Sequence, residues 1–198
     1  SRITNFKDYR SQDIAGTSTA ILFPVYNEDA VRVCEGLRAT YESLEKTGQL
    51  ARFDFFILSD STDPDKWIEE ERRWCDLVRE LDALGKIFYR RRVNNEGKKH
   101  GNVRDFLNTW GRRYRYFICF DADSVMRGET MVDLVRLMEA HPGAGLIQTV
   151  PARAQMVLPT ASWIFRVCPR ASWSAPDEIS SFMAGSFPVR LRVRSAQA

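Results

Sequence analysis

The residues most able to do chemistry are two aspartates separated by one residue, Asp121 and Asp123, at the end of an apolar run. The run, residues 116–120, reads Tyr-Phe-Ile-Cys-Phe and suits a strand buried on both faces of a parallel sheet. Such sheets bind ligands at the carboxyl ends of their strands, where both carboxylates would emerge. Neighbouring carboxylates repel each other unless a cation lies between them, and Mg²⁺ or Mn²⁺ suits oxygen ligands of this kind. The alternative is structural, with one aspartate capping a helix and the other solvated in a loop.

Further polar side chains follow other predicted strands. Glu28 follows the first strand, Asp60 follows the second, and Lys98 and Lys99 precede a predicted helix. A nucleoside diphosphate needs hydrogen-bond partners for its base, a cationic or helix-N-terminal cradle for its phosphates, and a metal ion. These residues therefore predict a nucleotide site at one edge of a sheet. Taken singly, Asp60 is equally consistent with a residue that forms a turn. The two lysines, taken singly, are consistent with solvated surface residues.

The elements that must position these residues alternate between strand and helix. Apolar runs predict strands at residues 19–25, 53–59, 86–91, 116–120 and 144–150. Amphipathic stripes between them predict helices that begin near residues 30, 64 and 99, with a fourth around residues 131–138. This alternation predicts an open α/β sheet with right-handed crossovers.

The two ends of the chain lack this pattern. Residues 1–18 are polar without a clear period and are interpreted as an arm. Residues 152–198 contain scattered prolines, clustered serines and arginines, and we expect a poorly specified tail with one short helix near residues 161–167. Such a tail is what a frameshift, a truncated gene or a fragment would produce. The remaining segment, residues 19–151, holds the predicted sheet.

Composition narrows the class of protein. The chain has 198 residues, is 44% hydrophobic and carries a net charge of +3, which argues against a dedicated nucleic-acid binder despite the arginines at residues 90–92. Its four cysteines lie far apart without metal-site spacing, so we expect buried thiols in a reducing compartment. Only two histidines are present, which argues against a histidine-based metal site. No apolar run reaches the roughly 18 residues of a membrane span.

Several motifs in sequence order resemble those of the inverting family 2 glycosyltransferases. They are Phe-Pro-Val-Tyr-Asn-Glu-Asp from residue 23, Gly-Leu-Arg-Ala-Thr-Tyr-Glu-Ser from 36, Phe-Asp-Phe-Phe-Ile-Leu-Ser-Asp from 53, Lys-Ile-Phe-Tyr-Arg-Arg-Arg from 86, Lys-His-Gly-Asn from 99, Asp-Ala-Asp-Ser from 121 and Gly-Leu-Ile-Gln-Thr from 145. More narrowly, they resemble the bacterial glucosyltransferases that make osmoregulated periplasmic glucans. The resemblance covers residues 19–151 and identifies them as a donor-binding part.

The resemblance implies a GT-A (Rossmann-like) nucleotide-sugar-binding sheet flanked by helices, here incomplete on its C-terminal side. It further implies a UDP-glucose donor, Mg²⁺ or Mn²⁺, and transfer of glucose to a growing β-1,2-glucan. Full-length family members are membrane-embedded and work at the cytoplasmic face of the bacterial inner membrane. The implied partners are thus a nucleotide sugar and a glucan acceptor.

Individual roles follow from the same resemblance. Tyr26 and Glu28 would line the nucleoside pocket, Asp60 would contact the uracil, and Lys99 would approach the uracil or the diphosphate. Asp121 would lie beside the donor and, with Asp123, hold the metal ion.

The general base is not assigned, because residues 152–198 show neither the family's acceptor-side aspartate nor its Gln-x-x-Arg-Trp motif or transmembrane helices. Asp177 and Glu178 lie in an unrelated context and receive no catalytic role. Two alternatives remain: a catalytically inactive UDP-sugar-binding fragment, and a sugar nucleotidyltransferase. The second requires a Gly-rich, basic loop after the first strand, where Pro-Val-Tyr-Asn-Glu stands instead.

Overall fold

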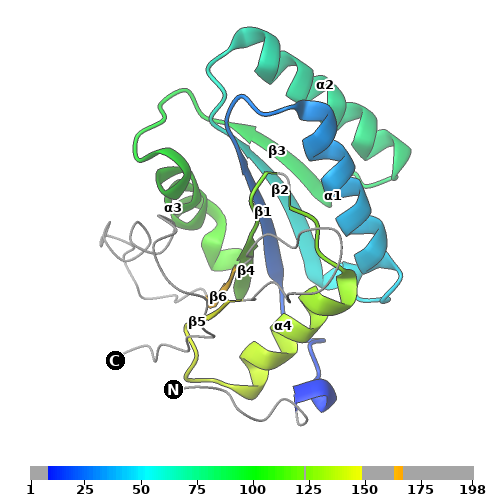
Figure 1. Cartoon of the computed structure of the whole chain (residues 1–198). Helices are drawn as coiled ribbons and strands as arrows, with labels where there is room; N and C mark the ends of the chain where they lie inside the picture. The colour runs from blue at the N-terminus through cyan, green and yellow to red at the C-terminus, as the bar shows by residue number, and fades with distance from the viewer. Residues whose placement is uncertain (1–8, 123, 149–162, 167–198) are drawn as a thin grey trace, which may run out of the picture.

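A six-stranded sheet in the order β3-β2-β1-β4-β6-β5 lies at the centre of the molecule, and helices cover both faces (Figure 1). The computed structural model describes residues 9–122, 124–148 and 163–166. The strands are β1 (Thr19–Val25), β2 (Phe53–Ser59), β3 (Ile87–Arg91), β4 (Tyr116–Cys119), β5 (Leu146–Gln148) and β6 (Trp163–Arg166). The helices are α1 (Ala30–Glu45), α2 (Pro64–Glu80), α3 (Lys98–Trp110) and α4 (Gly128–Ala140), with short 3₁₀ turns η1 (Tyr9–Ser11), η2 (Leu50–Arg52) and η3 (Gly111–Arg113).

Four neighbouring strands, β3, β2, β1 and β4, run parallel. Thr19 at the start of β1 pairs with Phe53 on one side and with Tyr116 on the other, so the three strands begin in register. All seven residues of β1 are buried, as the continuous apolar run predicts for a central parallel strand. Since parallel strands end at the same edge, the residues that follow β1, β2 and β4 are brought together there.

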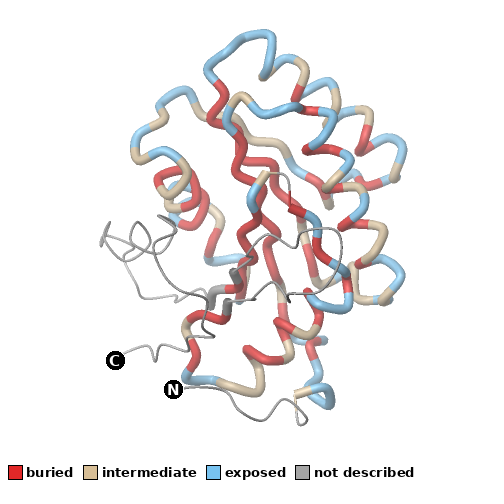
Figure 2. Tube along the Cα trace, viewed as in Figure 1, coloured by how far each residue is buried: buried red, intermediate tan, exposed pale blue. Residues whose placement is uncertain are grey.

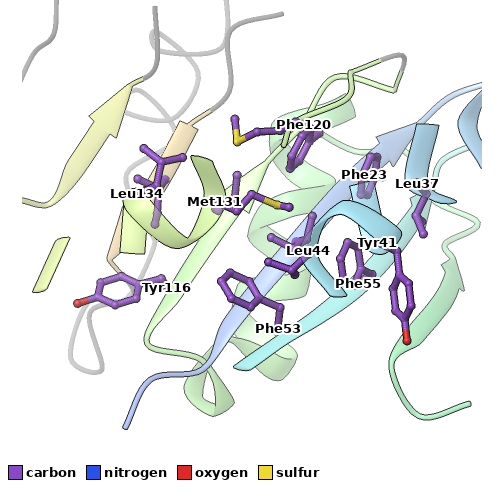
Figure 3. Close-up of a cluster of buried hydrophobic side chains, with 14 of the residues drawn as sticks. Phe23, Leu37, Tyr41, Leu44, Phe53, Phe55, Tyr116, Phe120, Met131 and Leu134 are labelled. Carbon is purple, nitrogen blue, oxygen red and sulfur yellow. The ribbon is translucent and has the colours of Figure 1, made fainter. Parts of the chain in front are cut away.

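Alternate residues of each central strand face different helices. Ile21 and Phe23 of β1 pack with α1, α2 and α4, whereas Ala20 and Leu22 pack with α3 on the opposite face. Figure 3 shows the larger cluster, in which aromatic rings of β1, β2 and β4 meet leucines and methionines of α1 and α4. Figure 2 shows the resulting band of buried backbone through the centre of the sheet. Each such ring buried from water stabilises the fold by about 1.5–3 kcal/mol.

Two side-chain caps set the starts of the helices next to the sheet edge. Asp29 accepts hydrogen bonds from the backbone N–H groups of Val31 at 2.9 Å and Arg32 at 3.2 Å, which fixes the start of α1. Asp63 accepts from Asp65 N–H at 3.0 Å, and proline occupies the first turn of α2. Both caps confirm the predicted helix starts, and they keep the loops after β1 and β2 short.

The helix predicted near residues 161–167 is wrong. Residues 163–166 form β6, which pairs antiparallel with both β4 and β5, so the sheet is mixed rather than fully parallel. The segment Trp-Ile-Phe-Arg is rich in aromatic and β-branched residues, and the free edge of β4 offers it backbone partners. Ile164 is fully buried there. β5 is shorter than the predicted strand at 144–150, whose last two residues lie outside the described part.

Other expectations for the ends and the cysteines are met in part. In the predicted arm, Tyr9 of η1 donates to Asp133 of α4 at 3.2 Å, while residues 1–8 lie outside the described part. Cys34 and Cys119 are buried free thiols as expected, but Cys75 is exposed. Cys168 and most of the predicted tail fall outside the described residues. Among the described helices, none has the length and apolar character needed to cross a membrane.

Candidate functional site

A cavity of about 780 Å³ lies where β1, β2 and β4 end and α3 begins. Its lining comes from the end of β1 and the loop after it, from the start of α1, from the residue after β2, from the loop before α3 and the first turns of α3, and from the residues after β4. All five residues predicted to contact the donor line this one cavity: Tyr26, Glu28, Asp60, Lys99 and Asp121. Asp123, the second predicted metal ligand, lies outside the described residues.

The loops after β1 and β2 are tied to each other at the cavity. Asn27 has a left-handed backbone with φ of 53°, and its side-chain oxygen accepts from the N–H groups of Thr62 at 3.1 Å and Asp63 at 3.2 Å. Asparagine tolerates this conformation better than most residues. Tyr26, just before it, is 56% exposed and so presents its ring at the cavity rather than to the core. These bonds fix the direction in which the Tyr26 and Glu28 side chains leave the loop.

Asp60 is almost completely buried, with 3% exposure, and is held by two neighbours. The guanidinium of Arg92 meets its carboxylate with two N–H groups: Nη2 lies 2.8 Å from Oδ2, and Nε bonds to Oδ1. The hydrogen bond to Asp60 raises the pKa of Arg92 above its ordinary value. Asn95 donates from its side-chain amide to the backbone oxygen of Asp60 at 2.7 Å. The predicted base-reading residue therefore has a fixed position in the cavity wall.

A second buried carboxylate, Glu70 of α2, lies behind this wall. It accepts hydrogen bonds from the hydroxyls of Ser59 at 2.6 Å, Ser61 at 2.5 Å and Tyr89 at 3.0 Å. The Ser61 hydroxyl accepts in turn from the backbone N–H of Asn27 at 2.7 Å. Glu70 thus fixes Ser59 and Ser61, the residues before and after Asp60 in the sequence. Through Ser61 it also holds the loop after β1.

The Lys-His-Gly-Asn segment at the start of α3 combines a structural lock with a charged group. Asn102 is fully buried and donates to the Leu58 oxygen at 2.9 Å, which fixes the helix to the end of β2. A Cβ on Gly101 would lie 2.0 Å from the Glu96 oxygen, so only glycine fits there. With the helix fixed in this way, Lys99 forms an ion pair with Asp121 across the cavity.

The electrostatics around Lys99 favour its charged form. Burial lowers the pKa of Lys99, but the nearby Cys119 and Asp121 outweigh burial, and the net shift is upward. Lys98 lies beside it on the cavity wall. The cavity therefore places ammonium groups at the N-terminus of α3, where a phosphate group would be favoured.

The three consecutive arginines considered for nucleic-acid binding point to internal partners. Arg90 donates to the Asn102 backbone oxygen at 3.2 Å, and the Arg91 guanidinium lies 4.4 Å from the ring centroid of Trp67. Arg92 is the partner of Asp60. Arg90 and Arg92 therefore support the cavity, and Arg91 holds the edge strand β3 to α2, so the three do not form a basic surface.

The cavity suits a hard divalent cation in its donor chemistry. Mg²⁺ and Mn²⁺ are commonly held by one or two carboxylates together with substrate phosphates, so a protein-only cage is not required. Asp121 supplies such a carboxylate beside the cavity, 51% exposed and within reach of a ligand. Within the described residues, no group of three or more histidine, cysteine, aspartate or glutamate side chains could hold a metal by itself.

Sequence reasoning missed the residues that support the site. Glu70 stands in a run of three glutamates, which reads as a solvated helix face, and Arg92 stands in a run of three arginines. For Glu70 a signal was present, because it lies three residues after Trp67 and four before Trp74, on the apolar stripe of α2. No comparable spacing distinguishes Arg92 within its run. Asn95, which also lines the cavity, lies in a loop without a periodic pattern that would have indicated its direction.

Two curated relatives are similar to this chain in sequence. The glucans biosynthesis glucosyltransferase H of Dickeya dadantii is 52% identical over 138 residues, and that of Pseudomonas aeruginosa (strain LESB58) is 53% identical over 142 residues. The matches cover 70% and 72% of this chain but only 16% of each relative, so the chain spans a small part of their length.

A solved structure gives independent evidence on the fold. The mannosyltransferase PcManGT of Pyrobaculum calidifontis, in complex with GDP-Man and Mn²⁺, has a TM-score of 0.51 and 19% identity. The superposition covers 74% of this chain and 41% of that chain. Residues 20–188 match the domain described as glycosyl transferase family 2. The predicted fold class and family are confirmed: the chain has a GT-A fold and belongs to glycosyl transferase family 2.

Proposed function

We propose that this chain is the donor-binding part of a glucosyltransferase that takes glucose from UDP-glucose and adds it to a growing β-1,2-glucan. The names of the relatives in Dickeya and Pseudomonas support a role in glucan synthesis. The observation that carries the proposal is the convergence of Tyr26, Glu28, Asp60, Lys99 and Asp121 on one cavity. The cavity volume of about 780 Å³ lies within the usual range for small-molecule sites.

The donor would lie across the cavity with its base near the loops after β1 and β2. Tyr26 offers an aromatic face to the uracil, and the Asp60 carboxylate accepts a hydrogen bond from it. Lys99 lies at the other end, at the start of α3, and meets the diphosphate as a point charge. The charges of the wall thus match the donor from base to phosphate.

Asp121 and Asp123 are the residues that would hold Mg²⁺ or Mn²⁺. The cation supplies Lewis-acid stabilisation of the negative charge that develops on the leaving UDP. Lys99 adds positive charge at the same place, from an ion pair with Asp121 that already exists without a ligand. This division of roles accounts for the ion pair of one carboxylate, Asp121, with Lys99 at the cavity.

Transfer requires an acceptor hydroxyl that attacks the anomeric carbon from the face opposite the UDP and inverts it. A general base, usually a carboxylate, must take the proton of that hydroxyl. No described residue is assigned this role. We propose that the acceptor is the glucan of osmoregulated periplasmic glucan synthesis and that the full protein acts at the cytoplasmic face of the bacterial inner membrane.

Incubation with UDP-[¹⁴C]glucose and Mg²⁺ or Mn²⁺ tests the proposal. Isothermal titration first measures binding of UDP-glucose, with ADP-glucose as the control for the base. Binding of UDP-glucose with release or transfer of labelled glucose supports a glucosyltransferase, whereas binding alone supports a non-catalytic UDP-sugar-binding fragment. Formation of labelled UTP and of glucose 1-phosphate from UDP-glucose and labelled pyrophosphate would identify a nucleotidyltransferase instead. Equal affinity for the two nucleotide sugars would contradict the proposed base site.

A further inference from the structure

We propose that Arg92, which is not among the described residues lining the cavity, determines the base selectivity of the site by fixing the Asp60 carboxylate. The inference rests on the proposed function, because it assumes that a nucleoside diphosphate occupies the cavity. Arg92 acts as a positioning residue through Asp60 and has no direct contact with the ligand. Its role follows from three sets of contacts.

The first set aligns Arg92 with the end of β2. Its backbone N–H donates to the Ser59 oxygen at 3.1 Å, which continues the pairing of β3 with β2 by one residue. The side chain is 11% exposed, and its Nε and Nη2 groups face the two oxygens of Asp60. A guanidinium that bonds both carboxylate oxygens fixes the carboxylate plane as well as its position. The ammonium group of a lysine cannot bind both carboxylate oxygens in this planar, bidentate way.

The second set links Asp60 to the phosphate end of the cavity. Nη2 of Arg92 also donates to the backbone oxygen of Lys98 at 2.9 Å. Lys98 has φ of 48°, a left-handed conformation that is costly for a residue with a side chain. The bond to Arg92 helps to hold this conformation. Arg92 therefore sets the distance between the residue that contacts the base and the lysines at the start of α3.

The third set completes the hold on Asp60 from the loop before α3. Asn95 donates its side-chain amide to the Asp60 backbone oxygen at 2.7 Å, and the Lys98 N–H donates to the Asn95 oxygen at 2.9 Å. Main chain and side chain of Asp60 are thus held by separate donors. Arg92 bonds to both oxygens of the Asp60 carboxylate. The lone pairs that Arg92 leaves free can accept a hydrogen bond from the base.

This arrangement selects for a base that offers an N–H group. Uracil carries a hydrogen on N3, and that N–H donates to a carboxylate. Cytosine has a lone pair on N3, which repels a carboxylate held in the same place, while its ring size and stacking surface match those of uracil. Sites built to hydrogen-bond a polar group reject analogues that lack it far more strongly than apolar pockets do. The ratio of the UDP affinity to the CDP affinity therefore measures the contribution of the Asp60–Arg92 pair to base selectivity.

The test compares the UDP and CDP affinities of the native protein, Arg92→Lys and Arg91→Lys by isothermal titration with Mg²⁺. Arg91→Lys is the matched control, because Arg91 stacks on Trp67 and does not bond to Asp60. We expect the ratio of UDP to CDP affinity to fall about tenfold or more in Arg92→Lys, the range for a lost partner at a buried polar group, and to stay unchanged in the control. An unchanged ratio in folded Arg92→Lys overturns the inference.

A second measurement does not depend on how the variant folds. The Nε–H resonance of Arg92 in the native protein should shift on addition of UDP and stay in place at an equal concentration of CDP. A resonance unmoved by saturating UDP would refute the role of Arg92. Failure of the native protein to bind UDP would contradict the proposed function itself, whereas UDP binding with selectivity independent of Arg92 contradicts this inference alone.

Discussion

Glu70→Gln should destabilise the fold even though Glu70 lies outside the cavity. The Glu70 side chain is buried and accepts from three hydroxyls, those of Ser59, Ser61 and Tyr89, at 2.5–3.0 Å. Glutamine keeps the size of the side chain, but its amide nitrogen cannot accept. At least one hydroxyl must therefore turn around or lose its partner, and the other bonds lose the strength that a charged acceptor gives.

The expected loss is about 1–3 kcal/mol in the free energy of unfolding, the cost of leaving one buried polar group without a partner. An opposing term exists, since removing a buried charge also removes its desolvation cost. That term is smaller here because three donors already solvate the Glu70 carboxylate. Ser61 would also hold Asn27 less firmly, so UDP affinity should fall in parallel.

Urea unfolding followed by tryptophan fluorescence measures the effect, since Trp67 and Trp74 lie on the same helix as Glu70. Glu71→Gln is the matched control: the neighbouring residue is exposed, so the same change there should stay within about 0.5 kcal/mol. Equal stability of the Glu70→Gln and Glu71→Gln proteins would refute the reasoning.

Four further predictions concern the first turn of α3, the ion pair and the thiols. Gly101→Ala should cost about 1–3 kcal/mol of stability in thermal unfolding, because its Cβ would meet a backbone oxygen at 2.0 Å, whereas Gly143→Ala has nothing within 4 Å and should be tolerated. Lys99→Met should weaken UDP binding yet strengthen binding of Mn²⁺ alone, because it frees Asp121; weaker Mn²⁺ binding in a titration would contradict this. At pH 8, peptide mapping after maleimide labelling should show modification of exposed Cys75 well before the buried thiols. Burial raises the pKa of those thiols, to about 12 for Cys34 and about 11 for Cys119. Because these folded-state values lie above the ordinary one, the stability they reflect is present below about pH 9 and is lost as the pH rises towards 11–12; unfolding that is independent of pH in this window would contradict it.

The central part of the fold could be predicted because its signals are local. The runs at residues 19–25 and 53–59 became β1 and β2 with those bounds, since continuous apolar residues between turns leave little choice of register. The helix starts near residues 30 and 64 could be predicted because capping depends only on neighbouring residues, and the structure shows Asp29 and Asp63 as the caps. β6 was missed because its four residues gain their stability from β4 and β5, which are remote in sequence.

The site could be predicted only as far as its position. Tyr26, Glu28, Asp60, Lys99 and Asp121 follow strands or precede a helix, and parallel strands bring such residues to one edge. Among their supports, Glu70 could have been found from its helical spacing with Trp67 and Trp74, whereas the inward direction of Arg92 depends on how β3 packs beside the end of β2. The metal role of Asp123 and the role of each donor residue stay predictions.

Titration of the native protein with UDP-glucose, in Mn²⁺ and again in EDTA, tests the central claim most directly. We predict one site per chain with Mn²⁺, much weaker binding in EDTA, and loss of the metal-dependent part in Asp123→Ala with the fold intact by circular dichroism. Binding that is equally strong in EDTA, or a folded Asp123→Ala protein with unchanged Mn²⁺-dependent affinity, would contradict a metal-assisted UDP-glucose site at this cavity.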